Sequence, residues 1–267
     1  MTEFEPLIIS APFGNYLRPR GTTATIGTFT ALRRGGRPAA LGRAALTLRY
    51  YRRLDAWVNR IGLRNPGIDS LARSPRHGPP VGESILSVHG FDAAEWTLLL
   101  DRARRLRPLA VELNISCPNV GEITWPESLF ADAVATGLPV IVKVPPVRFE
   151  GAVDAAVSAG VPWIHATNTL PVAKGGMSGA PLLPLAVNTV QWIRARHGSA
   201  VSIIGGGGIR TPHDIALFAS AGADRFAIGT YALRPAAVRG DRWVEDIRAA
   251  AQALATPTAS PDPSEKR

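Results

Sequence analysis

The chain has 267 residues, of which 46% are hydrophobic and 19% charged, and its net charge is +9. This length suits one large α/β domain or two small ones, and the composition argues against a disordered chain or a membrane protein. The charge comes almost entirely from arginine, since the only lysines are Lys143, Lys174 and Lys266. The arginines are scattered and not interleaved with aromatic residues, which favours a solvated surface over a nucleic-acid-binding face.

The segments that accompany export or membrane insertion are missing from the sequence. The acidic N-terminus lacks the basic and apolar regions of a signal peptide, and no apolar run has the length of a membrane span. Cys117 is the only cysteine, so the chain forms no internal disulfide and its thiol suits a reducing compartment. We therefore expect a cytoplasmic protein.

Apolar runs alternate with segments of helical periodicity along the chain. They predict strands at 7–11, 24–28, 84–88, 109–113, 138–144, 163–167, 201–204 and 225–228. They predict helices at 93–105, 151–159, 184–196, 209–221 and 241–254, and irregular structure over 30–55. Eight such strands indicate a closed parallel (β/α)₈ TIM barrel, with a doubly wound open sheet as the alternative. We expect 1–255 to form this one domain and the Pro/Ser-rich segment 256–267 to be a disordered tail.

Polar residues and glycines follow the apolar part of five predicted strands. They are Asn114, Ser116 and Cys117, then Lys143, then Asn168 and Thr169, then Gly207 and Gly208, and finally Gly229 and Thr230. Because the carboxyl ends of parallel strands meet at one end of a barrel, these residues predict a single site there.

Two of these groups have the chemistry of a phosphate cradle. The run 205–208 and the pair Gly229–Thr230 follow the last two strands, where backbone N–H groups can bind an anion. The alternative for either glycine group is a tight turn. Lys143 ends an apolar strand and is suited to neutralise an anionic or electron-rich ligand, unless it is a surface lysine with a buried stem.

Cys117 is either an inert buried thiol or a general base, because no His–Asp pair lies nearby in sequence to make it an acyl-transfer nucleophile. Asn114 and Asn119 flank it, and amides can recognise a planar ring that carries its own amide groups. His165 lies in an apolar strand and is expected to be a core histidine. The remaining histidines have no ligand spacing with the cysteine, so we predict no metal site.

These motifs together resemble the dihydroorotate dehydrogenase family, in particular its cytosolic class with a cysteine base. The matching segments follow the family order and lie at 59–67, 112–120, 140–145, 168–170, 175–179, 203–209 and 228–230. The string Glu-Leu-Asn-Ile-Ser-Cys-Pro-Asn at 112–119 is the most specific of them. The resemblance implies an FMN-binding barrel that oxidises dihydroorotate to orotate in pyrimidine biosynthesis.

The resemblance also implies roles for single residues. Cys117 is similar to the base that takes a proton from C5 while hydride leaves C6 for flavin N5. The residues that resemble the pyrimidine-binding set are Asn59, Ile61, Gly62, Leu63, Asn114, Asn119, Asn168 and Thr169. Those that resemble flavin and phosphate contacts are Ala11, Asn114, Lys143, Gly176, Gly207, Gly208, Gly229 and Thr230. A homodimer is implied as well, with an electron-transfer subunit as a further partner in some members.

The sequence departs from the family pattern at the end of the second strand. The family has a lysine there that touches both flavin and substrate, whereas this chain has Gly27 or, one residue further, Thr28. The segment between Thr169 and Gly175 is also short. Candidates for a substitute cation are Lys174, Arg18 and Arg20.

Three alternatives therefore stay open at this point. The chain is a family member acting on another dihydropyrimidine-like ring, an RNA-acting flavoprotein similar to dihydrouridine synthases, or a barrel without catalytic activity. The electron acceptor is also open among fumarate, a nicotinamide reached through a partner subunit, and a quinone.

Overall fold

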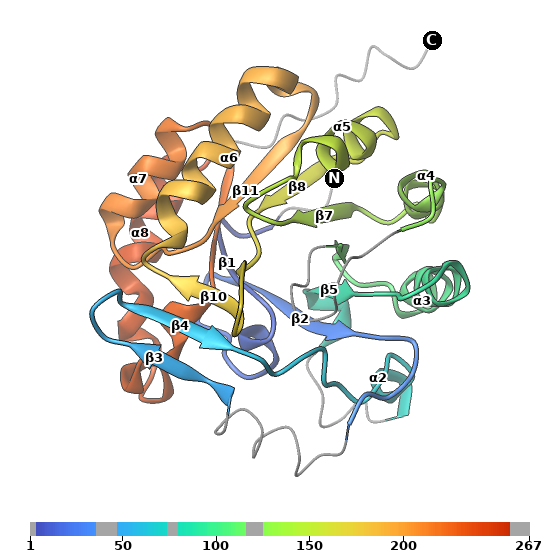
Figure 1. The fold of residues 1–267 in the computed structure, drawn as a ribbon, viewed down its shortest axis with the longest axis horizontal. Helices are drawn as coiled ribbons and strands as arrows, with labels where there is room; N and C mark the ends of the chain where they lie inside the picture. The colour runs from blue at the N-terminus through green and yellow to red at the C-terminus, as the bar shows by residue number, and fades with distance from the viewer. Residues whose placement is uncertain (1–3, 36–46, 74–79, 116–124, 257–267) are drawn as a thin grey trace.

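The barrel predicted from the sequence is present. The computed structural model describes residues 4–35, 47–73, 80–115 and 125–256. Eight strands close in the order β1-β12-β11-β8-β7-β6-β5-β2 (Figure 1). They are β1 (Leu7–Ile9), β2 (Thr23–Phe29), β5 (Ser84–Val88), β6 (Ala110–Asn114), β7 (Val140–Val144), β8 (Trp163–Ala166), β11 (Ser202–Gly206) and β12 (Arg225–Ile228). All neighbours pair in parallel, so the open-sheet alternative is wrong.

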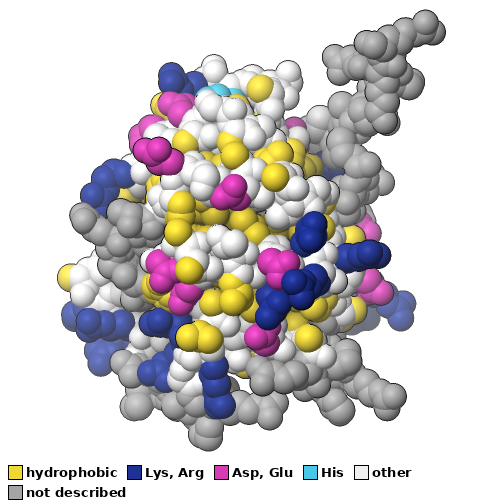
Figure 2. Space-filling model, turned by 90° about the vertical axis from the view of Figure 1, so that its right-hand side faces the viewer, with side chains coloured by type: hydrophobic (Ala, Val, Ile, Leu, Met, Phe, Trp, Pro, Cys, Tyr) yellow, Lys and Arg dark blue, Asp and Glu magenta, His cyan; other side chains and the backbone are white. Residues whose placement is uncertain are grey.

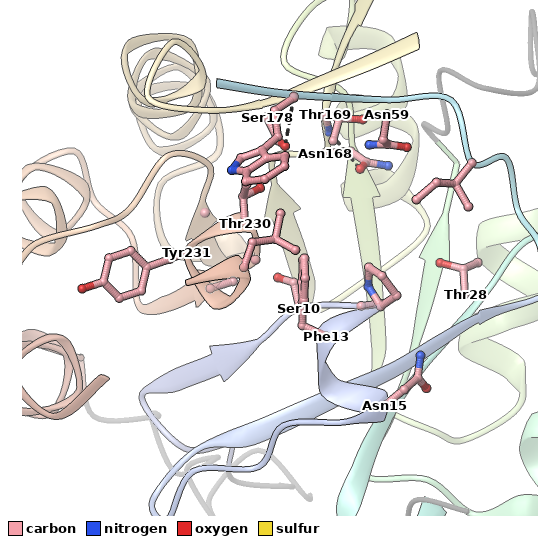
Figure 3. A pocket seen from close by; sticks show the side chains of 18 of the residues that line it. Ser10, Phe13, Asn15, Thr28, Asn59, Asn168, Thr169, Ser178, Thr230 and Tyr231 are labelled. Atoms are coloured by element: carbon pink, nitrogen blue, oxygen red, sulfur yellow. Dashed lines mark hydrogen bonds between the residues drawn. The ribbon is translucent and has the colours of Figure 1, made fainter. Parts of the chain in front are cut away.

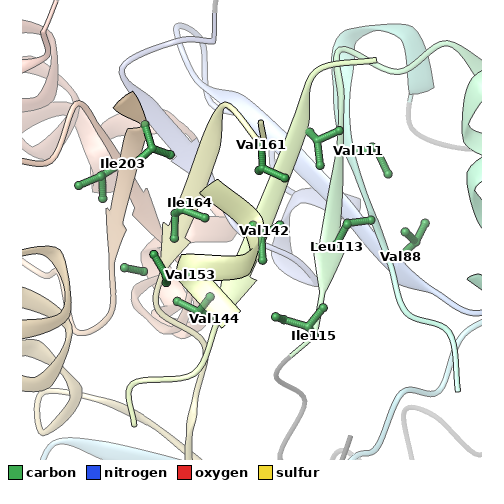
Figure 4. Packing of buried hydrophobic residues seen from close by; sticks show 14 of the residues in the cluster. Val88, Val111, Leu113, Ile115, Val142, Val144, Val153, Val161, Ile164 and Ile203 are labelled. Atoms are coloured by element: carbon green, nitrogen blue, oxygen red, sulfur yellow. The ribbon is translucent and has the colours of Figure 1, made fainter. Parts of the chain in front are cut away.

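The outer face of the barrel is apolar because helices cover it. On neighbouring strands Val111, Val142, Ile164 and Ile203 belong to one buried apolar cluster, which also includes Val153 of α5 (Figure 4). These side chains are fully buried. Burying both faces of parallel strands requires the near-continuous apolar runs that marked the strands in the sequence.

The inside of the barrel has an apolar layer with a polar layer above it. The apolar layer consists of Phe4, Ile8, Ile85, Ala110, Ile141, Trp163, Ile204 and Ala227. Side chains two positions later on a strand point to the same face. The next layer therefore holds Ser87, Glu112, Lys143, His165 and Gly206. The polar layer lies toward the carboxyl ends of the strands, where such barrels place their sites.

Each of the five predicted helices has a counterpart among the described residues, although their ends differ. They are α2 (Ser70–Arg73), α3 (Ala93–Leu106), α4 (Leu129–Ala135), α5 (Glu150–Ser158), α6 (Leu182–His197), α7 (Pro212–Ser220) and α8 (Glu245–Leu254). Short 3₁₀ turns lie at Phe13–Asn15, Val81–Glu83, Gly198–Ala200, Thr230–Leu233, Pro235–Val238 and Asp241–Val244.

Two predicted helix starts were wrong for local reasons. The helix predicted from residue 209 begins at Pro212, because Thr211 and Asp214 form a capping box that fixes the first turn. The helix predicted from residue 241 begins at Glu245, since the preceding four residues form a 3₁₀ turn. Helices α2 and α4 were not predicted.

A second, four-stranded antiparallel sheet was also not predicted. Its order is β3 (Arg49–Tyr51), β4 (Ala56–Asn59), β10 (Gly175–Gly179) and β9 (Leu170–Val172). Figure 1 shows β3, β4 and β10 side by side as a group. Residues 49–51 lie in the segment predicted to be irregular, so that prediction was wrong there. The sheet joins strands far apart in the sequence, and its register sets Gly176 opposite Asn59.

The described surface carries charges of both signs. On the face shown in Figure 2, basic side chains lie in several separate groups with acidic side chains among them. This agrees with the scattered arginines of the sequence. Among the helices of the described residues, none combines the length and apolar character that crossing a membrane requires.

Candidate active site

A large cavity opens at the carboxyl ends of the barrel strands. It has a volume of about 1430 Å³ and is lined by residues of the strand ends, of the segment 59–66 and of the 3₁₀ turn after β12. Pockets for small ligands usually measure roughly 300–1,000 Å³. This cavity therefore has room for a cofactor and a substrate together. In Figure 3, Asn59, Asn168 and Thr169 are grouped at one part of it, and Thr230 and Tyr231 at another.

The structure brings most of the predicted site residues into this one cavity. Those that line it are Ala11, Asn59, Ile61, Gly62, Leu63, Asn114, Lys143, Asn168, Thr169, Gly207, Gly208, Gly229 and Thr230. Gly176 is not among the lining residues; it is buried in β10, where its carbonyl accepts a 3.4 Å hydrogen bond from the Asn59 amide. Cys117 and Asn119 lie outside the described residues.

A chain of hydrogen bonds joins the amides at the cavity. The Asn168 amide donates to Asn114 Oδ1 and the Asn114 amide donates to Thr28 Oγ1, both over 3.0 Å. Thr28 Oγ1 lies 3.0 Å from the Ser87 hydroxyl. The connected side chains come from β2, β5 and β6 and from the residues after β8. They hold one another in fixed orientations, as recognition of a planar ring requires.

The absence of the expected lysine has a structural cause in the backbone at Gly27. Gly27 has φ +112°, and a Cβ built there would overlap the Ser87 carbonyl. The Asn15 side chain fixes this backbone through hydrogen bonds of 3.0 Å to both the N–H and the carbonyl of Gly27. The position cannot carry a side chain in this conformation, and the neighbouring hydroxyl of Thr28 faces Asn114 instead.

The three candidates for a substitute cation lie elsewhere. Arg18, Arg20 and Lys174 are not among the residues that line the cavity. Burial lowers the pKa of Arg18, with Glu83 acting in the opposite direction, and the Arg20 backbone N–H donates to Asp241 over 3.0 Å. The structure therefore gives no support to any of the three as the substitute cation.

A buried ionic group lies in the polar layer under the amides. His165 Nδ1 is 2.7 Å from Glu112 Oε2, and both side chains are at most 2% exposed. Burial alone would raise the pKa of Glu112, but the positive charge of Lys143 and the hydrogen bond from His165 lower it to about 2. Burial, and then Lys143, lower the pKa of His165. The lowered pKa values favour the anion of Glu112 and the neutral imidazole of His165.

Sequence reasoning expected His165 to be a core residue, and it is buried and hydrogen-bonded. It also lines the cavity together with Lys143. Glu112 was given no role, although a carboxylate inside an apolar strand, two residues before Asn114, was a signal that both side chains face the barrel interior.

The two glycine groups form a second part of the site, where backbone N–H groups are available to a ligand. Among the hydrogen bonds between described residues, none is donated by the N–H groups of Gly207, Gly208, Gly229 or Thr230. Gly207 and Gly208 have φ +131° and +80°, and a Cβ on Gly207 would come within 3.0 Å of Ala186 Cβ. Unpaired N–H groups of this kind suit an anion such as the phosphate of a cofactor.

Two arginines that the sequence argument missed lie near these glycines along the chain. Arg210 follows the glycine run and forms an ion pair with Asp55, which also accepts a 2.9 Å hydrogen bond from Tyr50. The Arg234 guanidinium lies 4.2 Å above the centre of the Tyr231 ring. Both arginines line the cavity. Arg234 adds positive charge there, whereas the charge of Arg210 is balanced by Asp55, which lines the same cavity.

Taken together, the fold and site define a (β/α)₈ barrel with amide side chains, a buried lysine and two glycine loops at one cavity. A family model described as dihydroorotate dehydrogenase matches residues 20–250. The chain belongs to the dihydroorotate dehydrogenase family, whose members are flavoprotein oxidoreductases that act on CH–CH groups.

Individual relatives of the chain carry the name of the same family. Dihydroorotate dehydrogenase A (fumarate) of Lacticaseibacillus paracasei is 31% identical in an alignment of 208 residues that covers 66% of this chain and 70% of that protein. The catalytic subunit of dihydroorotate dehydrogenase B (NAD(+)) of Listeria innocua is 33% identical in an alignment of 207 residues that covers 65% of this chain and 66% of that protein. The chain thus matches about two thirds of the length of these relatives.

The fold is similar to that of solved structures. The crystal structure of ligand-free DHODH from Eimeria tenella has a TM-score of 0.73 at 18% identity, over 92% of this chain and 83% of that one. The complex of the Eimeria tenella enzyme with ferulenol has a TM-score of 0.66 at 17% identity. At such identities the similarity concerns the fold.

Proposed function

We propose that this protein catalyses the FMN-dependent oxidation of (S)-dihydroorotate to orotate, a step of pyrimidine biosynthesis. The observation that carries the proposal is the convergence of Asn59, Asn114 and Asn168 with Lys143 in one cavity that also contains the glycine loops. Amides at one part and anion-binding N–H groups at another match a ring substrate and a phosphate-bearing cofactor. When bound, FMN would accept the hydride that leaves C6 of the substrate.

In this proposal the residues of the chain bind and orient the substrate and take a proton from it. The hydrogen-bonded pair Asn114 and Asn168, with Asn59, orients the amide groups of the substrate ring. Lys143 supplies a cation on the floor of the cavity, and it pairs in register with Asn114 of the neighbouring strand. Cys117 acts as the base that takes the proton from C5; this role rests on its place three residues after Asn114 in the specific string at 112–119.

The experiment that tests the function is an anaerobic titration followed by visible absorbance. The purified protein is expected to show the spectrum of bound oxidised flavin, and stoichiometric dihydroorotate is expected to bleach it. A protein without flavin after reconstitution with FMN, or one that keeps oxidised flavin with dihydroorotate and dihydrouracil alike, would contradict the proposal.

A second candidate substrate is a dihydropyrimidine without a carboxylate. It is favoured by the backbone at Gly27, which excludes the lysine expected to face the orotate carboxylate. The same titration separates the two candidates, because dihydrouracil and not dihydroorotate would then bleach the flavin.

The electron acceptor and the assembly belong to the proposal as well. The relatives include a fumarate enzyme and the catalytic subunit of an NAD(+) enzyme at similar identity, so similarity does not choose between these acceptors. We expect a cytoplasmic homodimer, which sedimentation equilibrium of the holoenzyme would test. Turnover with fumarate alone would favour an enzyme without a further subunit.

A further inference from the structure

The two ring nitrogens of His165 have different surroundings. Nδ1 lies 2.7 Å from Glu112 Oε2 inside the polar layer. Nε2 has no hydrogen-bond partner among the described residues, yet it is not one of the polar atoms that the protein encloses completely. The side chain is only 2% exposed and nevertheless lines the large cavity. One nitrogen is therefore held inside the barrel, and the other is open to the cavity.

Gly206 leaves space on the Nε2 side of this ring. A Cβ built on Gly206 would lie 3.2 Å from His165 Nε2 and 2.8 Å from the Ala227 carbonyl oxygen, so even the smallest side chain would be crowded there. Gly206 and Ala227 both line the cavity. The ring edge that carries Nε2 thus faces the end of β11, directly before the loop of Gly207 and Gly208.

The contact with Glu112 decides what Nε2 can do. A carboxylate only accepts hydrogen bonds, so the Nδ1 atom of His165 beside it carries the proton. In a neutral imidazole the other nitrogen is then an acceptor. Burial, and then the charge of Lys143, lower the pKa of His165 and favour this neutral form. The floor of the cavity therefore presents a hydrogen-bond acceptor at His165.

Lys143 is the neighbour of this acceptor. The two residues pair in register on β7 and β8, and both line the cavity. Neighbouring strands lie about 4.8 Å apart, so both side chains can contact one small planar ring. The ammonium group of a lysine only donates hydrogen bonds. A ring in which an N–H stands next to a carbonyl has the complementary pattern, because its carbonyl accepts from the lysine and its N–H donates to the imidazole.

His89 shows how a histidine with a purely structural place differs. Its Nδ1 lies 2.7 Å from the Asn114 carbonyl oxygen, and its Nε2 is enclosed without a partner among the described residues. The rings of Phe91 and Trp96 pack against it. His89 is not among the residues that line the cavity, whereas His165 is buried to a similar degree and still reaches it.

We propose that His165 Nε2 accepts a hydrogen bond from the N–H of a bound planar ring that carries this group beside a carbonyl. The flavin and the pyrimidine of the proposed function both have such an edge. The contact belongs to the flavin, because Nε2 faces the strand end that leads into the glycine loop suited to the cofactor's phosphate. The inference rests on the proposed function as far as the cofactor is FMN, and it is independent of which dihydropyrimidine is oxidised.

The test compares FMN with 3-methyl-FMN, in which a methyl group replaces the hydrogen of the ring N–H. Dissociation constants are measured from the change of flavin fluorescence when flavin-free, full-length protein is titrated. In the wild type, methylation is expected to weaken binding roughly 10-fold, as loss of one buried hydrogen bond does. His165→Asn keeps a side-chain N–H for Glu112 and removes Nε2. It should bind FMN roughly 10-fold more weakly than the wild type and lose most of the discrimination between the two flavins.

Two further variants accompany this comparison. His165→Gln places an amide near the position of Nε2 and is expected to retain part of the discrimination. His197 also lies beside a carboxylate, with Nε2 3.0 Å from Asp154 Oδ1, but it is not among the residues that line the cavity. His197→Asn is therefore the matched control and should discriminate like the wild type. Circular dichroism verifies that each variant is folded, and the wild-type comparison needs no variant.

A second arm distinguishes the two rings. Orotate and 3-methylorotate are titrated calorimetrically into the FMN-loaded wild type and His165→Asn. Equal discrimination by the two proteins is expected and leaves the contact with the flavin. Discrimination that is lost in His165→Asn in this arm alone overturns the assignment to the flavin and identifies the pyrimidine as the donor.

The outcomes separate this proposal from the function itself. Equal binding of FMN and 3-methyl-FMN by the wild type, with no loss of discrimination in the orotate arm, overturns the hydrogen bond. A loss of affinity in His165→Asn that is the same for both flavins overturns it too, because it would reflect a disturbed fold. Discrimination that depends on His165, in a protein whose flavin dihydroorotate does not bleach, would support the contact and contradict the proposed substrate.

Discussion

His165 and Glu112 are joined inside the barrel by a 2.7 Å contact between Nδ1 and Oε2, and both are almost completely buried. Lys143 is in register with His165 and brings a positive charge to the same layer. A carboxylate in this position is stabilised only because a cation and a hydrogen-bond partner accompany it. The group thus lies at the floor of the cavity, which Lys143 and His165 line, and its side chains are almost completely buried.

Removing the charge of Glu112 is expected to destabilise the protein. Glu112→Gln leaves Lys143 without its anion in a buried layer, so the free energy of unfolding should fall by roughly 3 kcal/mol. Urea denaturation followed by circular dichroism measures it. Asp101→Asn is the control, because Asp101 pairs with Arg102 and Arg105 at the surface, and it is expected to cost less than about 1 kcal/mol. Similar costs for both variants would contradict the assigned charge pairing.

The free energy of unfolding is expected to fall as the pH is lowered below about 6.5, the ordinary pKa of histidine. The pKa of His165 is lowered by burial, so below that pH the unfolded chain binds a proton that the folded protein does not. The pKa of Glu112 is lowered to about 2, so this carboxylate also stabilises the folded protein. Its contribution is lost only as the pH falls from about 4.3, the ordinary pKa of glutamate, toward the folded-state pKa of about 2.

Thermal unfolding between pH 7.5 and 5.5 tests this dependence. His165→Gln should flatten the slope of melting temperature against pH, although burial also lowers the pKa of His89, which will keep part of the slope. A His165→Gln slope equal to that of the wild type would show that His165 is protonated equally in both states.

The hydroxyl of Thr28 is expected to matter for ligand binding through Asn114. Thr28→Val removes the acceptor of the Asn114 amide and leaves a similar volume. Loss of one such hydrogen bond should weaken orotate binding about 10-fold, measured by calorimetry. Thr97→Val on the exposed face of α3, where the hydroxyl bonds the Ala93 carbonyl, should leave the affinity unchanged. An unaffected Thr28→Val protein would mean that Asn114 needs no support.

The glycine loop after β11 is expected to tolerate no side chain. Gly207→Ala adds a Cβ at φ +131° within 3.0 Å of Ala186 and 3.1 Å of Leu182, so the loop must move and its N–H groups lose their alignment. The ratio of flavin to protein after reconstitution with FMN should fall severalfold. Gly151→Ala in α5 has open space around it and should retain flavin while gaining roughly 0.5–1 kcal/mol of stability.

Cys117→Ser is expected to bind FMN normally and to be reduced more slowly by dihydroorotate. A serine hydroxyl has a much higher pKa than a thiol, so it is a poorer base near neutral pH. Stopped-flow absorbance with anaerobic dihydroorotate measures the rate, which should fall at least about 10-fold. An unchanged rate would exclude Cys117 as the base.

The barrel and the main site residues could be predicted from the sequence because they depend on local patterns. Runs such as 140–142 are apolar on both faces, as a parallel strand that is covered on both sides requires. Asn114, Lys143 and Asn168 stand where such runs end, so the topology alone brings them together. The pairing of β4 with β10 and the cap at Thr211 were missed, since the former depends on distant partners and the latter on a single capping box.

The sequence by itself determined the barrel, the polar residues that follow each strand and the family to which the chain belongs. Hydrophobic periodicity and the order of motifs can be read directly from the sequence. Only the tertiary structure decided how the charges are arranged. It paired Glu112 with His165 from different strands and excluded a side chain at Gly27 through contact with the Ser87 carbonyl. Such relations depend on distances between atoms of separate elements, and proximity in the sequence does not determine them. The examples are Arg18, Arg20 and Lys174, which lie near site motifs in the sequence but do not line the cavity.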